Sequence, residues 1–140
     1  MGYVDTSALV AYYCPEPLSP VVERILRKLA APTISPLVEV ELHAAVAVKL
    51  RRGELDAGSA NRIVSEFRLH LEDGLYHVVP IQAREFSLAR DWIARFSTAL
   101  RTLDALHLAA AFANGLTLVT ADKGLAKAAL ALGVRSRLVR

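Results

Sequence analysis

Residues 102–122, TLDALHLAAAFANGLTLVTAD, contain a helix, a turn and a strand in direct succession. Alanine and leucine dominate the first half, which predicts a buried helix, and Asn114-Gly115 supplies a turn that ends it. The apolar residues 116–120 then predict a strand, and Asp122 follows it closely. Short strands that are apolar throughout are typical of a parallel sheet with helices on both faces.

The same alternation of strands and helices extends outward to both ends of the chain. The pattern predicts further strands at residues 3–5, 33–35, 76–81 and 134–139. It predicts further helices over residues 7–13, 19–29, 36–53, 56–74, 84–96 and 123–132, with starts such as Ser35-Pro36 and stops such as Gly53. We therefore expect an α/β fold, and the length of 140 residues fits a single domain over residues 1–140.

The composition excludes several classes of protein. With 54% hydrophobic and 22% charged residues, the chain is not disordered. The lone Cys14 cannot form an internal disulfide, and there is no secretory signal, so we expect a cytoplasmic protein. Residues 105–121 carry no formal charge, but Asn114-Gly115 and His107 interrupt them, so we expect no membrane span.

The charge balance points toward a polyanionic partner without requiring one. The chain has 17 basic and 14 acidic residues, giving a net charge of +3, and most of the basic residues are arginine. Arginine matches the geometry of phosphate, although a basic surface also serves solubility. The candidate phosphate contacts are Lys123, Arg101 and Arg84.

Three aspartates are placed where a site would form. Asp5 ends the first predicted strand and Asp122 follows the fourth, so both belong at the carboxyl edge of the sheet, where α/β proteins bind ligands. Asp104 is the only charged residue in its helix. Each aspartate alone also fits helix capping or a favourable interaction with the helix dipole.

The fourth acid is one of two glutamates on the helix after the second strand. The helical neighbours of Glu41 are all apolar, whereas Glu39 lies on a more polar face. A buried carboxylate without a partner costs several kcal/mol, so Glu41 requires one, and its apolar stripe offers no lysine or arginine.

Four carboxylates gathered at one edge would repel one another. At about 5 Å and an effective dielectric of about 20, each pair costs about 3 kcal/mol. A hard divalent cation, Mg²⁺ or Mn²⁺, relieves this repulsion through oxygen ligands, and no Cys/His spacing favours zinc. Carboxylate sites of this kind hydrolyse phosphodiesters.

Four segments in this order resemble a known family. They are YVDTSAL (3–9), ISPLVEVEL (34–42), LDALHLAAA (103–111) and LVTADK (118–123). The chain resembles PIN-domain nucleases, and among them the VapC-type toxins of toxin–antitoxin pairs, over nearly its whole length. The resemblance implies a three-layer α/β/α domain with a mostly parallel five-stranded sheet.

The resemblance also implies an activity and a set of site residues. It implies an endoribonuclease dependent on Mg²⁺ or Mn²⁺, with an RNA substrate, a cognate antitoxin and a homodimeric state. The implied catalytic and metal-binding acids are Asp5, Glu41, Asp104 and Asp122. The implied supporting residues are Thr6, Ser7 and Thr120. Glu39 departs from the pattern, because that position is usually uncharged.

His107 and the activity itself remain open to alternatives. His107 lies one turn after Asp104 and is either a donor to that carboxylate or, as we favour, a buried histidine with its hydrogen bonds satisfied. A receiver domain is excluded because no Asp ends the third strand, and a haloacid-dehalogenase-type phosphatase is disfavoured because Ser7 stands where its second Asp belongs. A PIN fold that binds a nucleic acid or a protein without catalysis remains the alternative, and a DNA substrate is a further one.

Overall fold

A computed structural model describes residues 1–140. The strands are β1 (Gly2–Val4), β2 (Thr33–Ile34), β3 (His77–Val78), β4 (Thr117–Thr120) and β5 (Ser136–Leu138). The helices are α1 (Thr6–Tyr13), α2 (Ser19–Lys28), α3 (Pro36–Arg51), α4 (Ala57–Glu72), α5 (Ala83–Ala94), α6 (Thr102–Ala113) and α7 (Lys123–Ala131).

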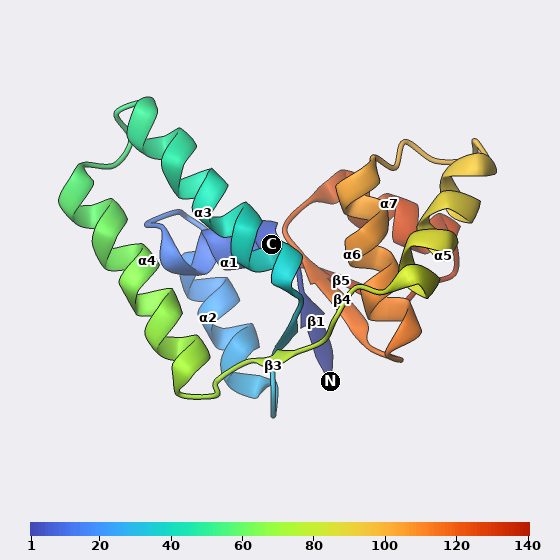
Figure 1. Cartoon of the computed structure of the whole chain (residues 1–140), viewed down its shortest axis with the longest axis horizontal. Coiled ribbons are helices and arrows are strands. Elements are labelled where there is room, and N and C mark those ends of the chain that lie inside the picture. Colours follow the sequence, from blue (N-terminus) through green and yellow to red (C-terminus); the bar gives the residue numbers. More distant parts are fainter.

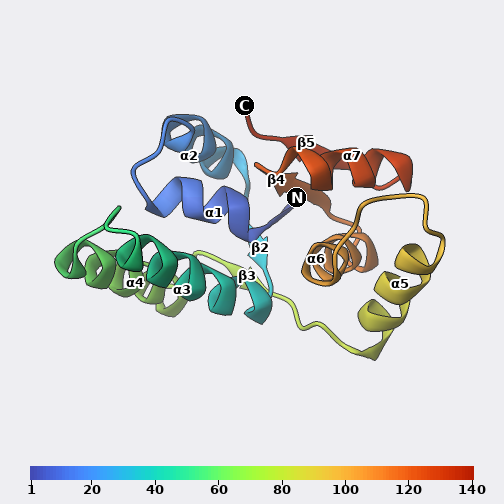
Figure 2. The same cartoon turned by 90° about the horizontal axis from the view of Figure 1, so that it is seen from above.

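The five strands form one sheet in the order β3-β2-β1-β4-β5, and every neighbouring pair is parallel. Helices α1 to α4 lie on one side of the sheet and α5 to α7 on the other (Figures 1 and 2). The predicted three-layer α/β/α fold with a five-stranded parallel sheet is therefore confirmed. The strand order reverses between β1 and β4, which is where sheets of this kind form their ligand crevice.

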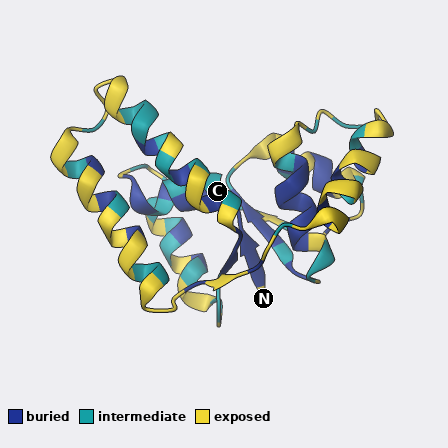
Figure 3. Cartoon of the chain, viewed as in Figure 1, coloured by how far each residue is buried: buried dark blue, intermediate teal, exposed yellow.

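The core lies where the central strands meet α6. Strand β1 is fully buried, and residues 105–111 of α6 are all buried because the helix packs between the sheet and α5 (Figure 3). Gly115 follows the C-cap residue Asn114 and adopts a φ of 66°, which is the left-handed conformation that ends a helix. The predicted helix, turn and strand of residues 102–122 are confirmed.

The main departure from the expected elements is the third strand. It was expected over residues 76–81 but is confined to His77–Val78. It lies at the edge of the sheet, where it pairs only with β2, and Pro80 has no N–H to extend the ladder. Helix α6 begins at Thr102, and Arg101 is its N-cap residue. None of the helices combines the length and apolar character needed to cross a membrane.

Candidate functional site

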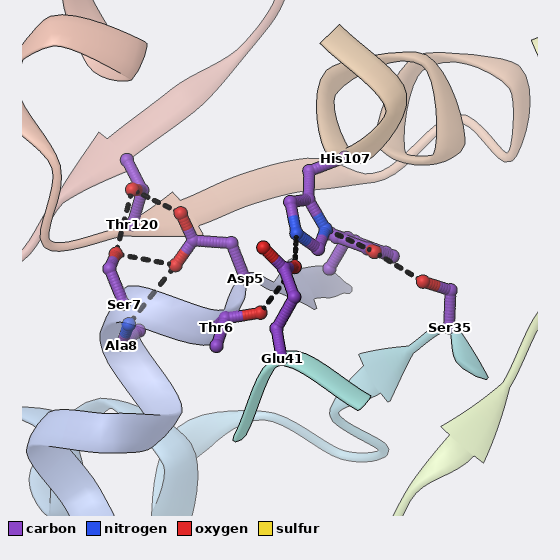
Figure 4. Close-up of polar contacts among 9 residues, drawn as sticks. Asp5, Thr6, Ser7, Ala8, Ser35, Glu41, His107 and Thr120 are labelled. Carbon is purple, nitrogen blue, oxygen red and sulfur yellow. Dashed lines mark hydrogen bonds and ion pairs between the residues drawn. The ribbon is translucent and has the colours of Figure 1, made fainter. Parts of the chain in front are cut away.

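Asp5 is held in a fixed orientation at the end of β1, where it is the N-cap of α1. Its Oδ1 accepts hydrogen bonds from Ser7 Oγ at 2.7 Å and from the Ala8 amide at 3.0 Å, and its Oδ2 accepts one from Thr120 Oγ1 at 2.5 Å (Figure 4). Burial raises the pKa of Asp5, and these hydrogen bonds and the nearby His107 oppose the rise. The structure thus places Ser7 and Thr120 against one of the predicted acids.

Asp104 has acidic neighbours but no partner. It lies in the first turn of α6, is half-buried, and makes no hydrogen bond or ion pair. Burial and the charge of Asp122 raise the pKa of Asp104, with a smaller contribution from Asp5, while His107 and Arg101 oppose the rise. The structure therefore brings Asp122 and Asp5 within electrostatic reach of Asp104.

Asp122 is the most exposed of the four candidate acids. It is the N-cap of α7, and its Oδ1 accepts a hydrogen bond from the Leu125 amide at 3.1 Å. Its own amide donates to Thr120 Oγ1 at 3.0 Å, which links it to the residue that also binds Asp5. Asp122 therefore caps a helix and also lies among the candidate acids.

Glu41 is the glutamate of α3 that faces the site. Its Oε1 accepts a hydrogen bond from Thr6 Oγ1 at 2.8 Å and another from His107 Nε2 (Figure 4). Burial acts to raise the pKa of Glu41, but the hydrogen bond and charge of His107 and the bond from Thr6 outweigh it, so this pKa is lowered. Glu39 is exposed and its carboxylate makes no hydrogen bond or ion pair, as the helical stripe predicted.

His107 is buried with both ring nitrogens bonded, as favoured from the sequence, but its acidic partner is Glu41. Its Nε2 contacts Glu41, and its Nδ1 lies 2.8 Å from Tyr3 Oη. The alternative of a hydrogen bond to Asp104 is wrong, because that carboxylate receives only the electrostatic influence of the ring. Spacing within α6 pointed to Asp104, whereas the fold directs the ring across to α3.

The three basic candidates fall in different surroundings. Arg101 is exposed at the N-cap of α6 and acts on Asp104, and Lys123 is exposed at the start of α7 beside Asp122. Arg84 instead pairs with Glu85 through Nε at 2.9 Å, and none of the interactions of the candidate acids involves it. The structure therefore brings Arg101 to Asp104, keeps Lys123 next to Asp122 in the chain, and leaves Arg84 outside the site.

Glu85 is a buried carboxylate that the sequence analysis did not single out. Its side chain is 1% exposed and forms a capping box with Gln82 at the start of α5. The Gln82–Glu85 spacing is the signal that would have identified it. Because Glu85 is satisfied by Arg84 and by the helix start, it has a structural role.

A family model described as PIN domain matches residues 2–130. The chain belongs to the PIN domain family. The matched range contains all four candidate acids, and the resemblance that rests on the four sequence segments is confirmed.

Several solved structures share the fold of this PIN domain. FitAcB from Neisseria gonorrhoeae is 21% identical with a TM-score of 0.70, and the alignment covers 97% of this chain and 96% of that one. VapC20 from Mycobacterium tuberculosis, described as a sarcin–ricin loop cleaving toxin, is 19% identical with a TM-score of 0.70, covering 91% and 95%. VapBC2 from Rickettsia felis bound to promoter DNA is 18% identical with a TM-score of 0.74, covering all of both chains. No curated protein matches the sequence.

The donor set of this PIN domain fits a hard divalent cation. All candidate ligands are carboxylates, and the Asp104 carboxylate, beside Asp122 and Asp5, has no bonded partner. No three His, Cys, Asp or Glu side chains lie close enough together to enclose an ion. Mg²⁺ usually retains several waters and binds through one or two carboxylates, so it does not require such a closed group.

The opposite pKa shifts of Asp104 and Glu41 predict opposite stability changes in the metal-free PIN domain. The pKa of Asp104 is higher in the folded protein than in the unfolded chain, so ionising this carboxyl group destabilises the fold once the pH exceeds the unfolded-state pKa. Asp104→Asn removes that charge and should therefore raise the Tm at pH 7. The lowered pKa of Glu41 means that its charge contributes stability that is lost as the pH falls through the folded-state pKa, so Glu41→Gln should lower the Tm. We expect shifts of about 2 °C in thermal unfolding with EDTA present. Shifts of the same sign would contradict this assignment.

Proposed function

We propose that the chain is an endoribonuclease dependent on Mg²⁺ or Mn²⁺ and the toxin of a VapBC-type pair. The observation that carries the proposal is the unpartnered carboxylate of Asp104 beside Asp122 and Asp5 at the point where the strand order reverses. A carboxylate left without a partner among like charges is costly unless a cation joins it.

The four acids share one task in this proposal. Asp5, Glu41, Asp104 and Asp122 would hold the cation, which when bound polarises the phosphoryl group and stabilises the charge that develops during hydrolysis. The three donors to Asp5 keep its carboxylate oriented, and Thr6 and His107 do the same for Glu41. Arg101 and Lys123 are exposed beside Asp104 and Asp122, where they can hold the phosphates that flank the scissile bond.

The proposed partners follow from the structural neighbours. The Rickettsia felis structure is a VapBC pair on promoter DNA, and VapC20 is described as cleaving the sarcin–ricin loop. By likeness of fold we propose an antitoxin partner, an RNA substrate and a homodimer for this chain as well.

A second candidate is a PIN domain that binds a nucleic acid or a protein without cleaving RNA. The observation that favours it is the absence of a group of three acidic, histidine or cysteine side chains close enough to enclose a metal. The two candidates differ in whether RNA is cut, so one assay separates them.

The test is cleavage of total RNA by the purified protein. We expect fragments with Mg²⁺ or Mn²⁺, no fragments with EDTA, and recovery when the metal is restored in excess. Cleavage that continues in EDTA would contradict the metal dependence. RNA that is bound in a gel-shift assay but never cut, with either metal, would favour the second candidate.

A further inference from the structure

A buried chain of side-chain hydrogen bonds leads from the sheet to Glu41. Ser35 Oγ lies 2.7 Å from Tyr3 Oη, Tyr3 Oη lies 2.8 Å from His107 Nδ1, and His107 Nε2 contacts Glu41 Oε1 (Figure 4). Ser35 and Tyr3 are completely buried and His107 is 3% exposed. We refer to Ser35, Tyr3 and His107 as the relay.

The relay joins segments that are distant in sequence. Tyr3 belongs to β1, Ser35 is the N-cap of α3, and His107 belongs to α6. Its members are therefore fixed by the central strand and by a helix on each side of the sheet. Ser35 makes no side-chain capping bond to α3, so its hydroxyl is free to serve Tyr3.

The hydroxyl of Tyr3 is not needed for packing. A phenylalanine ring would fill the same apolar volume, and a buried hydroxyl costs free energy unless it is hydrogen-bonded. This hydroxyl has two partners, and one of them is the ring that contacts Glu41. Its effect is to fix the orientation of the imidazole.

The direction of the hydrogen bonds follows from the carboxylate. An ionised carboxylate only accepts, so His107 Nε2 donates to Glu41. In a neutral ring Nδ1 then accepts from Tyr3 Oη, and the phenol oxygen accepts from Ser35. Glu41 Oε1 is thus occupied by His107 and Thr6, whereas Oε2 makes no hydrogen bond.

We propose that Tyr3 and His107 are positioning residues that hold the Glu41 carboxylate with one oxygen directed to a divalent cation. This inference rests on the proposed function. Mutating a residue that hydrogen-bonds to a metal ligand typically lowers metal affinity 10- to 100-fold. The relay is such a partner for Glu41, because His107 bonds the carboxylate directly and Tyr3 acts on it through His107.

The test compares two tyrosine-to-phenylalanine variants by Mn²⁺ binding in the absence of RNA, measured by electron paramagnetic resonance. Tyr3→Phe should weaken Mn²⁺ binding about tenfold. Tyr13→Phe is the matched control, because Tyr13 Oη also bonds a histidine, His70 Nδ1 at 2.7 Å, and a second hydroxyl, Tyr76 Oη at 2.6 Å, away from the acids. It should bind Mn²⁺ within about twofold of the wild type. If Tyr3→Phe does not fold, Ser35→Ala at the far end of the relay takes its place, with a smaller loss expected.

A second readout needs no metal. In nitrogen-15 NMR, the ring signals of His107 should shift in Tyr3→Phe and in Glu41→Gln and remain unchanged in Tyr13→Phe. Unchanged His107 signals in the first two variants, or Mn²⁺ binding by Tyr3→Phe equal to that of the wild type, would overturn the relay alone. A wild-type protein that binds no Mn²⁺ would overturn the proposed function and, with it, the role of the relay in metal binding.

Discussion

Asp104→Asn is expected to lower RNA cleavage about a thousandfold while the protein remains folded. Asn keeps the size of the side chain but removes the charge, and losing about 4 kcal/mol of electrostatic stabilisation of the transition state corresponds to that factor. The residue has no hydrogen bond to lose, so the substitution removes no structural contact. The measurement is the initial rate of total RNA cleavage at saturating Mn²⁺, with circular dichroism to verify the fold.

The matched control is Asp73→Asn. Asp73 is an exposed aspartate at the C-cap of α4, remote from the acids. Its substitution should leave the rate within about twofold of the wild type. If Asp104→Asn cleaves RNA as fast as Asp73→Asn, the proposed mechanism is wrong.

Glu41→Gln should reduce cleavage about a hundredfold, whereas Glu39→Gln should change it by less than about twofold. Both glutamates are on α3, but only Glu41 receives hydrogen bonds from Thr6 and His107. Glutamine keeps the shape of Glu41 and loses the negative charge that attracts a cation. The measurement is the initial rate of RNA cleavage by the two variants, prepared in parallel. The reverse order would show that the exposed glutamate supports the activity.

The sequence was sufficient to predict the fold and to distinguish Glu41 from Glu39. Residues 102–122 combine a buried helix, a turn and an apolar strand, and local patterns of this kind are the most reliable signals. The helical stripe of α3 placed Glu41 inward because only periodicity along one helix was needed. The length of β3 was overestimated because its edge position depends on the assembled sheet.

The relay could not be predicted from the sequence because its contacts are long-range. Tyr3 and His107 are separated by 104 positions and Tyr3 and Ser35 by 32. A tyrosine in a buried strand reads as core, and only the packed structure shows which polar atoms its hydroxyl meets. For the same reason spacing along α6 pointed His107 to Asp104, while tertiary packing turns it to Glu41.

The reversal of strand order divides the acids equally between the two helical layers. Asp5 caps α1 and Glu41 belongs to α3, on one side of the sheet, whereas Asp104 belongs to α6 and Asp122 caps α7, on the other. Neither the N-terminal half of the chain nor the C-terminal half contains all four acids. The proposed RNA cleavage therefore requires both helical layers of the folded domain. A fragment that ends anywhere between α4 and α5 would contain only two of the four acids and should not cleave RNA.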